Sequence, residues 1–239
     1  MNYELSIMNY PVILHIETST NVCSVALSEG LNCLFSKSND EKMNHATLLS
    51  VYIAEALEVL KTTTKRLDAI AVSSGPGSYT GLRIGVSTAK GLCYGLDIPL
   101  ISVSTLEVMT ITALKAVNGQ ENVLYCPMID ARRMEVYAAF YDAQLELKRE
   151  ISADIISLDS YSKQLADQPV YFFGNGAEKC KSTLTHPNAR FIENIFPVAE
   201  NMIPLAVEVF NRNQFADVAY FEPFYLKEFQ TTAPKKNQG

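Results

Sequence analysis

The glycine-rich stretch 73–85 (SSGPGSYTGLRIG) constrains the fold of this chain more than any other segment. An unbroken apolar run, Leu67–Ser73, comes before it and predicts a strand that is buried on both faces. Residues 75–77 predict a tight turn, because proline fixes φ and glycine tolerates positive φ. A hydroxyl directly after this turn, that of Ser78 or Thr80, can cap a following helix. The stretch therefore predicts a strand, a turn and a helix in close succession.

This predicted helix, which we expect to end near Leu96, has two faces that lack charge. An apolar stripe repeats at helical spacing and consists of Leu82, Gly85, Val86, Ala89, Leu92, Cys93 and Leu96. A second face holds Ile84, Thr88, Gly91 and Gly95. Glycine inside a helix costs roughly 1 kcal/mol relative to alanine, so a close backbone contact is expected to compensate. Two interpretations stay open: a helix between its own sheet and a second body, or a central helix buried in one domain.

A glycine-rich turn before a helix also raises the question of phosphate binding, because helix N-termini present free N–H groups. The spacing in 73–85 lacks the Gly-Lys-Ser/Thr of a Walker loop, and it does not follow GxGxxG. A purely structural turn is therefore favoured over a phosphate site.

Composition narrows the class of protein. A chain of 239 residues with a net charge of −6 is unlike a nucleic-acid-binding protein that works alone, although a local basic patch within a larger assembly stays open. The N-terminus lacks the basic start of a signal peptide, and no apolar run reaches the roughly 20 residues of a membrane span. Five scattered cysteines predict reduced thiols in a cytoplasmic protein.

The order of predicted elements repeats. The first half predicts strands 12–18, 22–28 and 31–37, a helix from the cap Asn44 to Leu60, the central strand and helix, strand 99–103, and a helix from the cap Ser104 to Val117. The second half predicts strands 122–130, 134–142 and 145–150, helix 159–166, strand 169–173, a helix from Ala177 and helix 199–211. Two βββαβα units are typical of the α/β fold of the actin/hexokinase/Hsp70 (ASKHA) superfamily, in which each half is RNase H-like.

The predicted domain organisation follows from this repeat. We expect an N-terminal extension at 1–11, an RNase H-like domain at 12–118, a second and degenerate RNase H-like domain at 119–228, and a flexible tail at 229–239.

Two segments are candidates for chemistry. Glu17-Thr18-Ser19-Thr20 ends the first strand, where a carboxylate beside hydroxyls can position a metal ion or water, but a turn stabilised by its own hydroxyls is favoured. The segment 130–133 (DARR) suits either a phosphate-contacting loop or a solvated turn, and the sequence does not separate the two.

The three histidines are far apart and have no His or Cys partner three or four residues away, so no metal site is expected. The chain has no GxSxG motif for a nucleophile.

Five segments together resemble the TsaB (YeaZ) family: 13–19 (ILHIETS), 74–85 (SGPGSYTGLRIG), 98–106 (IPLISVSTL), 129–137 (IDARRMEVY) and 222–226 (EPFYL). The resemblance covers residues 12 to 228 and implies an accessory subunit for making threonylcarbamoyladenosine (t6A) at position 37 of tRNA. It implies a pseudoenzyme with no catalytic residues and no cofactor, and it leaves open whether any residues bind one. The His-x-x-x-His metal pair of the related catalytic subunit TsaD is absent, because Leu49 stands four residues after His45. Many family members have Asp at the position of Glu17, which weakens any inherited phosphate role.

The resemblance further implies a heterodimer with TsaD through the first two helices of the N-terminal half. The expected partner-interface residues are His45, Leu49, Tyr52, Ile53, Ala56, Arg83, Ile84, Ser87, Thr88, Gly91 and Gly95. The ATPase TsaE is expected to join the complex, and tRNA is expected to be reached only through that complex. When TsaD is missing, the chain is expected to form a homodimer through a similar surface. The rival hypotheses are an enzyme in its own right, either an ASKHA-type ATPase or a peptidase, and a structural homodimer unrelated to tRNA.

Overall fold

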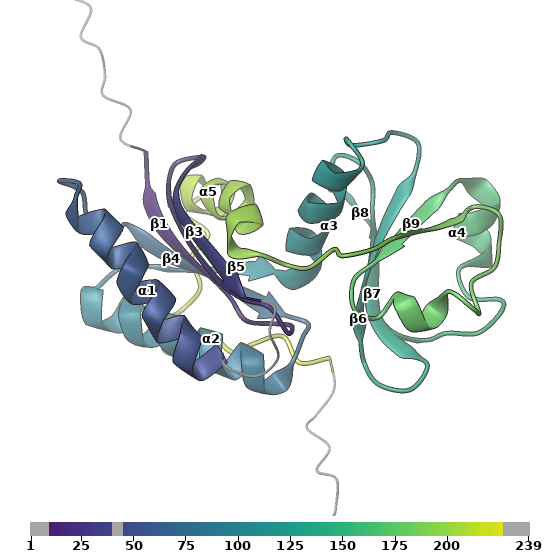
Figure 1. Cartoon of the computed structure of the whole chain (residues 1–239), viewed down its shortest axis with the longest axis horizontal. Coiled ribbons are helices and arrows are strands. Elements are labelled where there is room, and N and C mark those ends of the chain that lie inside the picture. The colour runs from purple at the N-terminus through teal and green to yellow at the C-terminus, as the bar shows by residue number, and fades with distance from the viewer. Residues whose placement is uncertain (1–9, 40–44, 227–239) are drawn as a thin grey trace, which may run out of the picture.

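Two five-stranded mixed sheets form the framework of the computed structural model (Figure 1). The structure describes residues 10–39 and 45–226. The predicted extension 1–11 therefore lies outside the described residues apart from Tyr10 and Pro11, as do the predicted cap Asn44 and the predicted tail 229–239.

The two sheets have the same strand pattern. In the first, the order is β3-β2-β1-β4-β5, with β1 (Val12–Glu17), β2 (Cys23–Glu29), β3 (Asn32–Asn39), β4 (Ala69–Gly75) and β5 (Leu100–Ser104). In the second, the order is β8-β7-β6-β9-β10, with β6 (Leu124–Asp130), β7 (Glu135–Tyr141), β8 (Leu147–Ile155), β9 (Val170–Phe173) and β10 (Ala189–Ile192). In each sheet the first three strands are antiparallel neighbours and the last two are parallel additions. The predicted duplication and its ASKHA fold class are confirmed.

The helices differ in length between the halves. They are α1 (His45–Lys61), α2 (Tyr79–Leu96), α3 (Thr105–Ala116), α4 (Ser162–Asp167) and α5 (Ile203–Asn211), with single 3-10 turns η1 (Glu178–Cys180) and η2 (Ala199–Met202). The predicted bounds of α2 and its cap are confirmed, since the Gly81 N–H donates to Ser78 Oγ over 3.3 Å. The helix predicted from Ala177 is only η1, and β10 was not predicted. Ser104 precedes α3 as predicted, but its side chain makes no capping bond.

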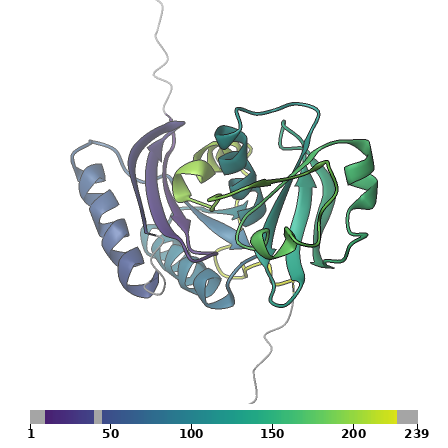
Figure 2. The same ribbon diagram turned by 45° about the vertical axis from the view of Figure 1, so that its right-hand side comes forward.

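The helices cover the first sheet on both faces. Helices α1 and α2 pack side by side on one face, where the buried side chains of Leu49 and Val86 join those of Leu14 and Val25 from the strands (Figures 1 and 2). The last helix, α5, crosses back from the second half and covers the opposite face of the first sheet. Sequence periodicity predicts a helix at 199–211 but does not say on which sheet it packs. The domain boundaries after residues 118 and 228 stay a prediction.

Helix α3 joins the two halves. Its side chains Leu106 and Met109 are buried with those of the second sheet, whereas Val108 is buried with those of the first. The two sheets are thus connected through one helix that contributes to both cores.

The N-terminus of α2 lies directly on the turn between β1 and β2. The Ser78 N–H donates to the Ser19 carbonyl over 2.6 Å, and the Thr18 hydroxyl donates to the Gly81 carbonyl over 2.8 Å. A Cβ at Gly77 or Gly81 would collide with the backbone of this turn. A Cβ at Gly91 would meet nothing within 4 Å. The first glycines of α2 therefore permit close contact within the chain, while the later ones do not.

This difference predicts opposite effects of the same substitution at two positions of α2. We expect Gly81→Ala to lower the free energy of unfolding by about 1–3 kcal/mol, because the new methyl group overlaps the Thr18 carbonyl. We expect Gly91→Ala to raise it by about 0.5–1 kcal/mol, because alanine favours the helix and the site is open. Urea denaturation measures both, and equal stability of the two variants would contradict the close packing.

Candidate functional site

The first candidate site is the corner where the parallel strands β1 and β4 end at the same edge of the first sheet. Glu17 is the last residue of β1, and its side chain is fully buried. Its Oε1 accepts the Ser19 N–H over 2.6 Å and the Ser73 hydroxyl over 3.0 Å. Its Oε2 is buried without a hydrogen-bond partner among the described residues. Burial raises the pKa of Glu17, and the hydrogen bonds that favour the carboxylate only partly oppose this effect.

This corner is filled by the chain itself. The Ser78 N–H, which could otherwise meet an anion at the start of α2, is used by the Ser19 carbonyl. Gly77, in the turn before α2, and Gly81 pack against the backbone of Ser19 and Thr18, so the chain itself fills the space between this turn and the helix. The closed packing supports the structural interpretation of residues 17–20 over a phosphate or metal site.

The histidines do not assemble into a site either. His15 lies in β1, fully buried, and its Nε2 is 2.9 Å from Ser28 Oγ. Burial lowers the pKa of His15 to about 3, so the ring is neutral. Within residues 10–39 and 45–226, no group of three or more His, Cys, Asp or Glu side chains is arranged to hold a metal ion.

The second candidate site is the equivalent corner of the second sheet, where the parallel strands β6 and β9 end. Gly174 and Gly176 pack against the backbone of Met128 and Ile129, which brings the β9–η1 turn onto the end of β6. The Asp130 N–H donates to Asn175 Oδ1 over 2.9 Å. This corner has the single turn η1 in place of a long helix, so the segment 130–133 remains at the surface.

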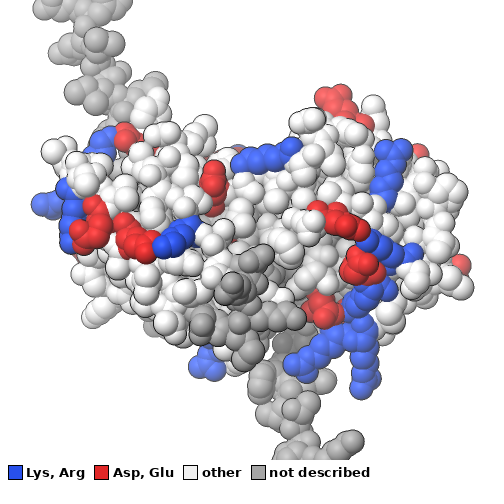
Figure 3. Space-filling view, viewed as in Figure 1, with Lys and Arg blue, Asp and Glu red and all other residues white. Residues whose placement is uncertain are grey.

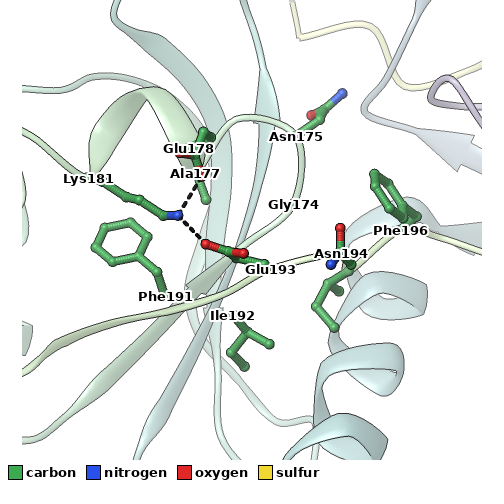
Figure 4. Close-up of a pocket in the computed structure, with 11 residues that line it drawn as sticks. Gly174, Asn175, Ala177, Glu178, Lys181, Phe191, Ile192, Glu193, Asn194 and Phe196 are labelled. Atoms are coloured by element: carbon green, nitrogen blue, oxygen red, sulfur yellow. Dashed lines mark hydrogen bonds and ion pairs between the residues drawn. The ribbon is translucent and has the colours of Figure 1, made fainter.

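A cavity of about 360 Å³ lies beside this second corner (Figure 4). Its walls include Phe191 and Ile192, and Lys181 forms ion pairs with Glu178 at 2.6 Å and with Glu193 at 2.7 Å. Lys181 is paired with both carboxylates, so the lysine and the two glutamates together carry a net charge of −1. The cavity is therefore a poor site for an anion.

The turn between β6 and β7 carries two exposed arginines in an unusual conformation. Arg132 and Arg133 have φ values of 71° and 50°. This left-handed region costs roughly 1–2 kcal/mol per residue for side chains other than glycine. Asp130 holds the turn, since its Oδ1 accepts the Arg132 N–H over 3.0 Å and its carboxylate pairs with Lys179. The sequence left the role of this segment open, and the structure shows a strained, positively charged tip.

The third candidate is the outer surface of α1 and α2, the two helices that carry the predicted partner-interface residues. Four of these, Leu49, Tyr52, Ile53 and Ala56, are buried against the first sheet, so their side chains are not on the surface. The apolar stripe of α1 faces the sheet within the same chain.

The other predicted interface residues lie at or near the surface. Arg83, Ser87, Gly91 and Gly95 are exposed, and His45, Ile84 and Thr88 are half-buried. The six residues of α2 follow one side of the helix at helical spacing. We call this side, defined by Arg83, Ile84, Ser87, Thr88, Gly91 and Gly95, the outer face of α2.

Three exposed apolar side chains of α1 and α2 were not among the predicted residues. Val51 on α1 is 46% exposed, and Tyr94 and Leu96 on α2 are 86% and 51% exposed. Val51 lies outside the set of apolar residues that α1 buries at helical spacing. An apolar residue at such a position is a sequence signal for an exposed apolar side chain. Leu96 is the last residue of α2 and lies beyond the buried part of the stripe.

The C-terminal segment 216–225 contacts β5, β4 and, through Lys90, α2. The Ala216 N–H donates to the Leu100 carbonyl over 2.9 Å, and the Phe224 N–H donates to the Ser74 carbonyl over 2.7 Å. Lys90 Nζ donates to the Phe221 carbonyl over 2.9 Å. These contacts leave the outer face as the open side of α2 along Ser87 and Gly91.

Comparison with known proteins gives matches over most of the chain. A protein-family model described as "TsaD: tRNA N6-adenosine threonylcarbamoyltransferase" matches residues 39–220. The protein is 33% identical to the "tRNA threonylcarbamoyladenosine biosynthesis protein TsaB" of Escherichia coli K12, over 90% of this chain and 94% of that protein. It is 34% identical to the protein of the same description from Bacillus subtilis, over 68% of this chain and 70% of that protein.

A solved structure shows the same fold. YeaZ from Pseudomonas aeruginosa superposes with a TM-score of 0.78 at 23% identity, over 90% of this chain and 100% of that chain. In the described part of the chain, no helix has the length and apolar character to cross a membrane.

The buried Glu17 predicts a pH-dependent effect of substitution. Its pKa is raised in the folded state, so wild-type stability decreases as pH rises from the ordinary carboxyl pKa of about 4.3 to the raised value. Glu17→Gln keeps a neutral side chain, and we expect its stability relative to wild type to increase with pH by about 1.4 kcal/mol per pH unit of this interval. Urea denaturation between pH 4.5 and 8 measures the difference. The exposed Glu58→Gln is the control, and an identical pH profile for both variants would contradict a raised pKa of Glu17.

Proposed function

The chain belongs to the TsaB (YeaZ) family of tRNA threonylcarbamoyladenosine biosynthesis proteins, and we propose that it is a non-catalytic accessory subunit in t6A formation at position 37 of tRNA. In this proposal the chain acts by dimerising with the catalytic subunit TsaD and supporting it. The TsaD family model matches residues 39–220, so TsaD is expected to share the duplicated fold.

The observation that carries the proposal is the outer face of α2. Gly91 and Gly95 are exposed inside a helix, and a Cβ at either would meet nothing within 4 Å. A helix loses stability at such glycines unless something approaches its backbone closely. A helix of a partner is the element that fits this shape, because small residues allow two helix axes to come near each other.

The position of this face also favours a related partner. Helices α1 and α2 lie together on the outside of the first half (Figure 2). If TsaD carries the same two helices, the two proteins can pack like surfaces against each other, as in the two-fold interfaces of homodimers. The same geometry supports a homodimer of this chain when TsaD is missing. Val51 on α1 and Leu96 on α2 add exposed apolar surface to these two helices.

The closed corner at Glu17 supports an assembly role rather than chemistry in this chain. An ATPase would need a phosphate site and a peptidase a metal or a nucleophile. The tight contact of the start of α2 with the β1–β2 turn supports a structural role for this corner. We further propose that TsaE joins the complex, that the chain carries no cofactor, and that it acts in the cytoplasm.

The proposal predicts that bulk on the outer face prevents assembly. We expect Ser87→Arg/Gly91→Arg to weaken binding of TsaD at least tenfold, because two long charged side chains would separate the helices. Both positions are exposed, so the thermal midpoint of the variant should stay close to that of wild type. Calorimetric titration with purified TsaD measures the affinity.

The matched control for this experiment is Ser182→Arg, which places the same side chain at an exposed position of the second half. We expect this variant to bind TsaD like wild type. Unchanged affinity of the α2 variant would show that the partner binds another surface.

A further inference from the structure

We propose that Arg132 and Arg133, at the tip of the β6–β7 turn, bind phosphates of the tRNA backbone, so that this chain contacts the RNA directly. The inference rests on the proposed function, in which tRNA is the substrate of the complex. It adds a nucleic-acid contact on the second half, away from the outer face of α2. It is consistent with our expectation that tRNA is reached only through the complex.

The charge of the turn is the first observation. Arg132 and Arg133 are exposed, and neither forms an ion pair with another residue that the structure describes. Asp130, two residues before Arg132, is already paired with Lys179, whose Nζ also donates to the Glu135 carbonyl over 2.6 Å. Asp130 therefore holds the turn without cancelling the charge of the arginines. Figure 3 shows Lys and Arg side chains gathered at the lower edge of the second half.

The backbone of the turn is the second observation. Both arginines have left-handed φ values, a conformation that glycine and asparagine adopt more easily. A turn that only had to close the hairpin would not need two arginines here. The two side chains are thus held at strained positions, and such strain is typical of residues that act on a ligand.

The surroundings favour an extended polyanion over a small enclosed anion. The neighbouring cavity carries the carboxylates of Glu178 and Glu193 around a single lysine, so it disfavours a bound nucleotide phosphate. The arginines instead lie at an exposed hairpin tip, where a phosphate backbone can cross the surface. A guanidinium donates two parallel hydrogen bonds to one phosphate, and neighbouring guanidiniums can serve successive phosphates.

The net charge of the chain fits this limited role. At −6 the whole protein repels RNA, so binding requires a local basic patch together with a partner. A two-arginine turn supplies a contact that positions the RNA without binding it strongly alone. Such contacts do not distinguish sequences, as expected of a protein that serves many tRNAs.

The test uses the complex of the full chain with TsaD and measures tRNA binding by fluorescence anisotropy at several salt concentrations. We expect Arg132→Asn/Arg133→Gly to lower affinity at least tenfold and to reduce the slope of log K against log salt by about 2, one for each lost phosphate contact. We expect the same variant to unfold at an equal or higher temperature than wild type, because Asn and Gly relieve the strained turn.

The control Arg66→Gln/Lys163→Gln removes the same charge at two other exposed positions, and its affinity should stay within twofold of wild type. Unchanged affinity and salt slope in the turn variant would overturn the inference. Loss of TsaD binding by that variant would also overturn it, because the arginines would then serve the protein partner. If the variant binds TsaD and tRNA like wild type, the proposed accessory role stands and only the proposed RNA contact is overturned.

Discussion

The contact between the first turn of α2 and the β1–β2 turn is the feature on which the rest of the structure depends. A hydrogen bond of 2.6 Å from Ser78 to Ser19 and the missing side chains of Gly77 and Gly81 bring two backbones together. This contact closes the corner at Glu17 and fixes the helix on its sheet. It also decides which side of α2 points outward, so that Gly91 and Gly95 are left open. One packing interaction thus removes a possible ligand site and exposes a possible interface.

The two halves show how the same topology yields different surfaces. In the first half, an 18-residue helix follows β4 and covers the ends of β1 and β4. In the second half, only the single turn η1 follows β9, and Asp130 at the end of β6 stays exposed. The strained turn with Arg132 and Arg133 lies at this second corner. Shortening of one helix therefore accounts for the different character of the two halves.

Most helices and strands could be predicted from the sequence, but which other elements they pair with or pack against could not always be predicted. The bounds of α2 follow from a strong cap at Ser78 and regular periodicity, both of which are local. The four residues of β10 have no such signal, because the strand is defined by its pairing with β9. The placement of α5 on the first sheet depends equally on distant contacts. Local patterns predict an element, while its packing partner is a property of the whole fold.

The same limit applies to the candidate site. The resemblance implied an interface that includes Leu49, Tyr52, Ile53 and Ala56 of α1, and these side chains pack on the chain's own sheet. An apolar stripe has the same spacing whether it meets a sheet or a partner. The exposed glycines of α2 carry more information, since a glycine in a helix has no intrinsic benefit. The conformation of Arg132 and Arg133 could not be predicted, because arginine has no preference for positive φ.

The central claim is that this chain works by assembly and not by chemistry at its own closed corner. The most direct measurement is t6A formation on tRNA by purified TsaD, TsaE and the threonylcarbamoyl-adenylate synthase, with and without this chain. Our account predicts strict dependence on the chain and full activity with Glu17→Gln, whose side chain lies in the closed corner. Formation of t6A without the chain, or its loss in a Glu17→Gln protein that still binds TsaD, would contradict the account.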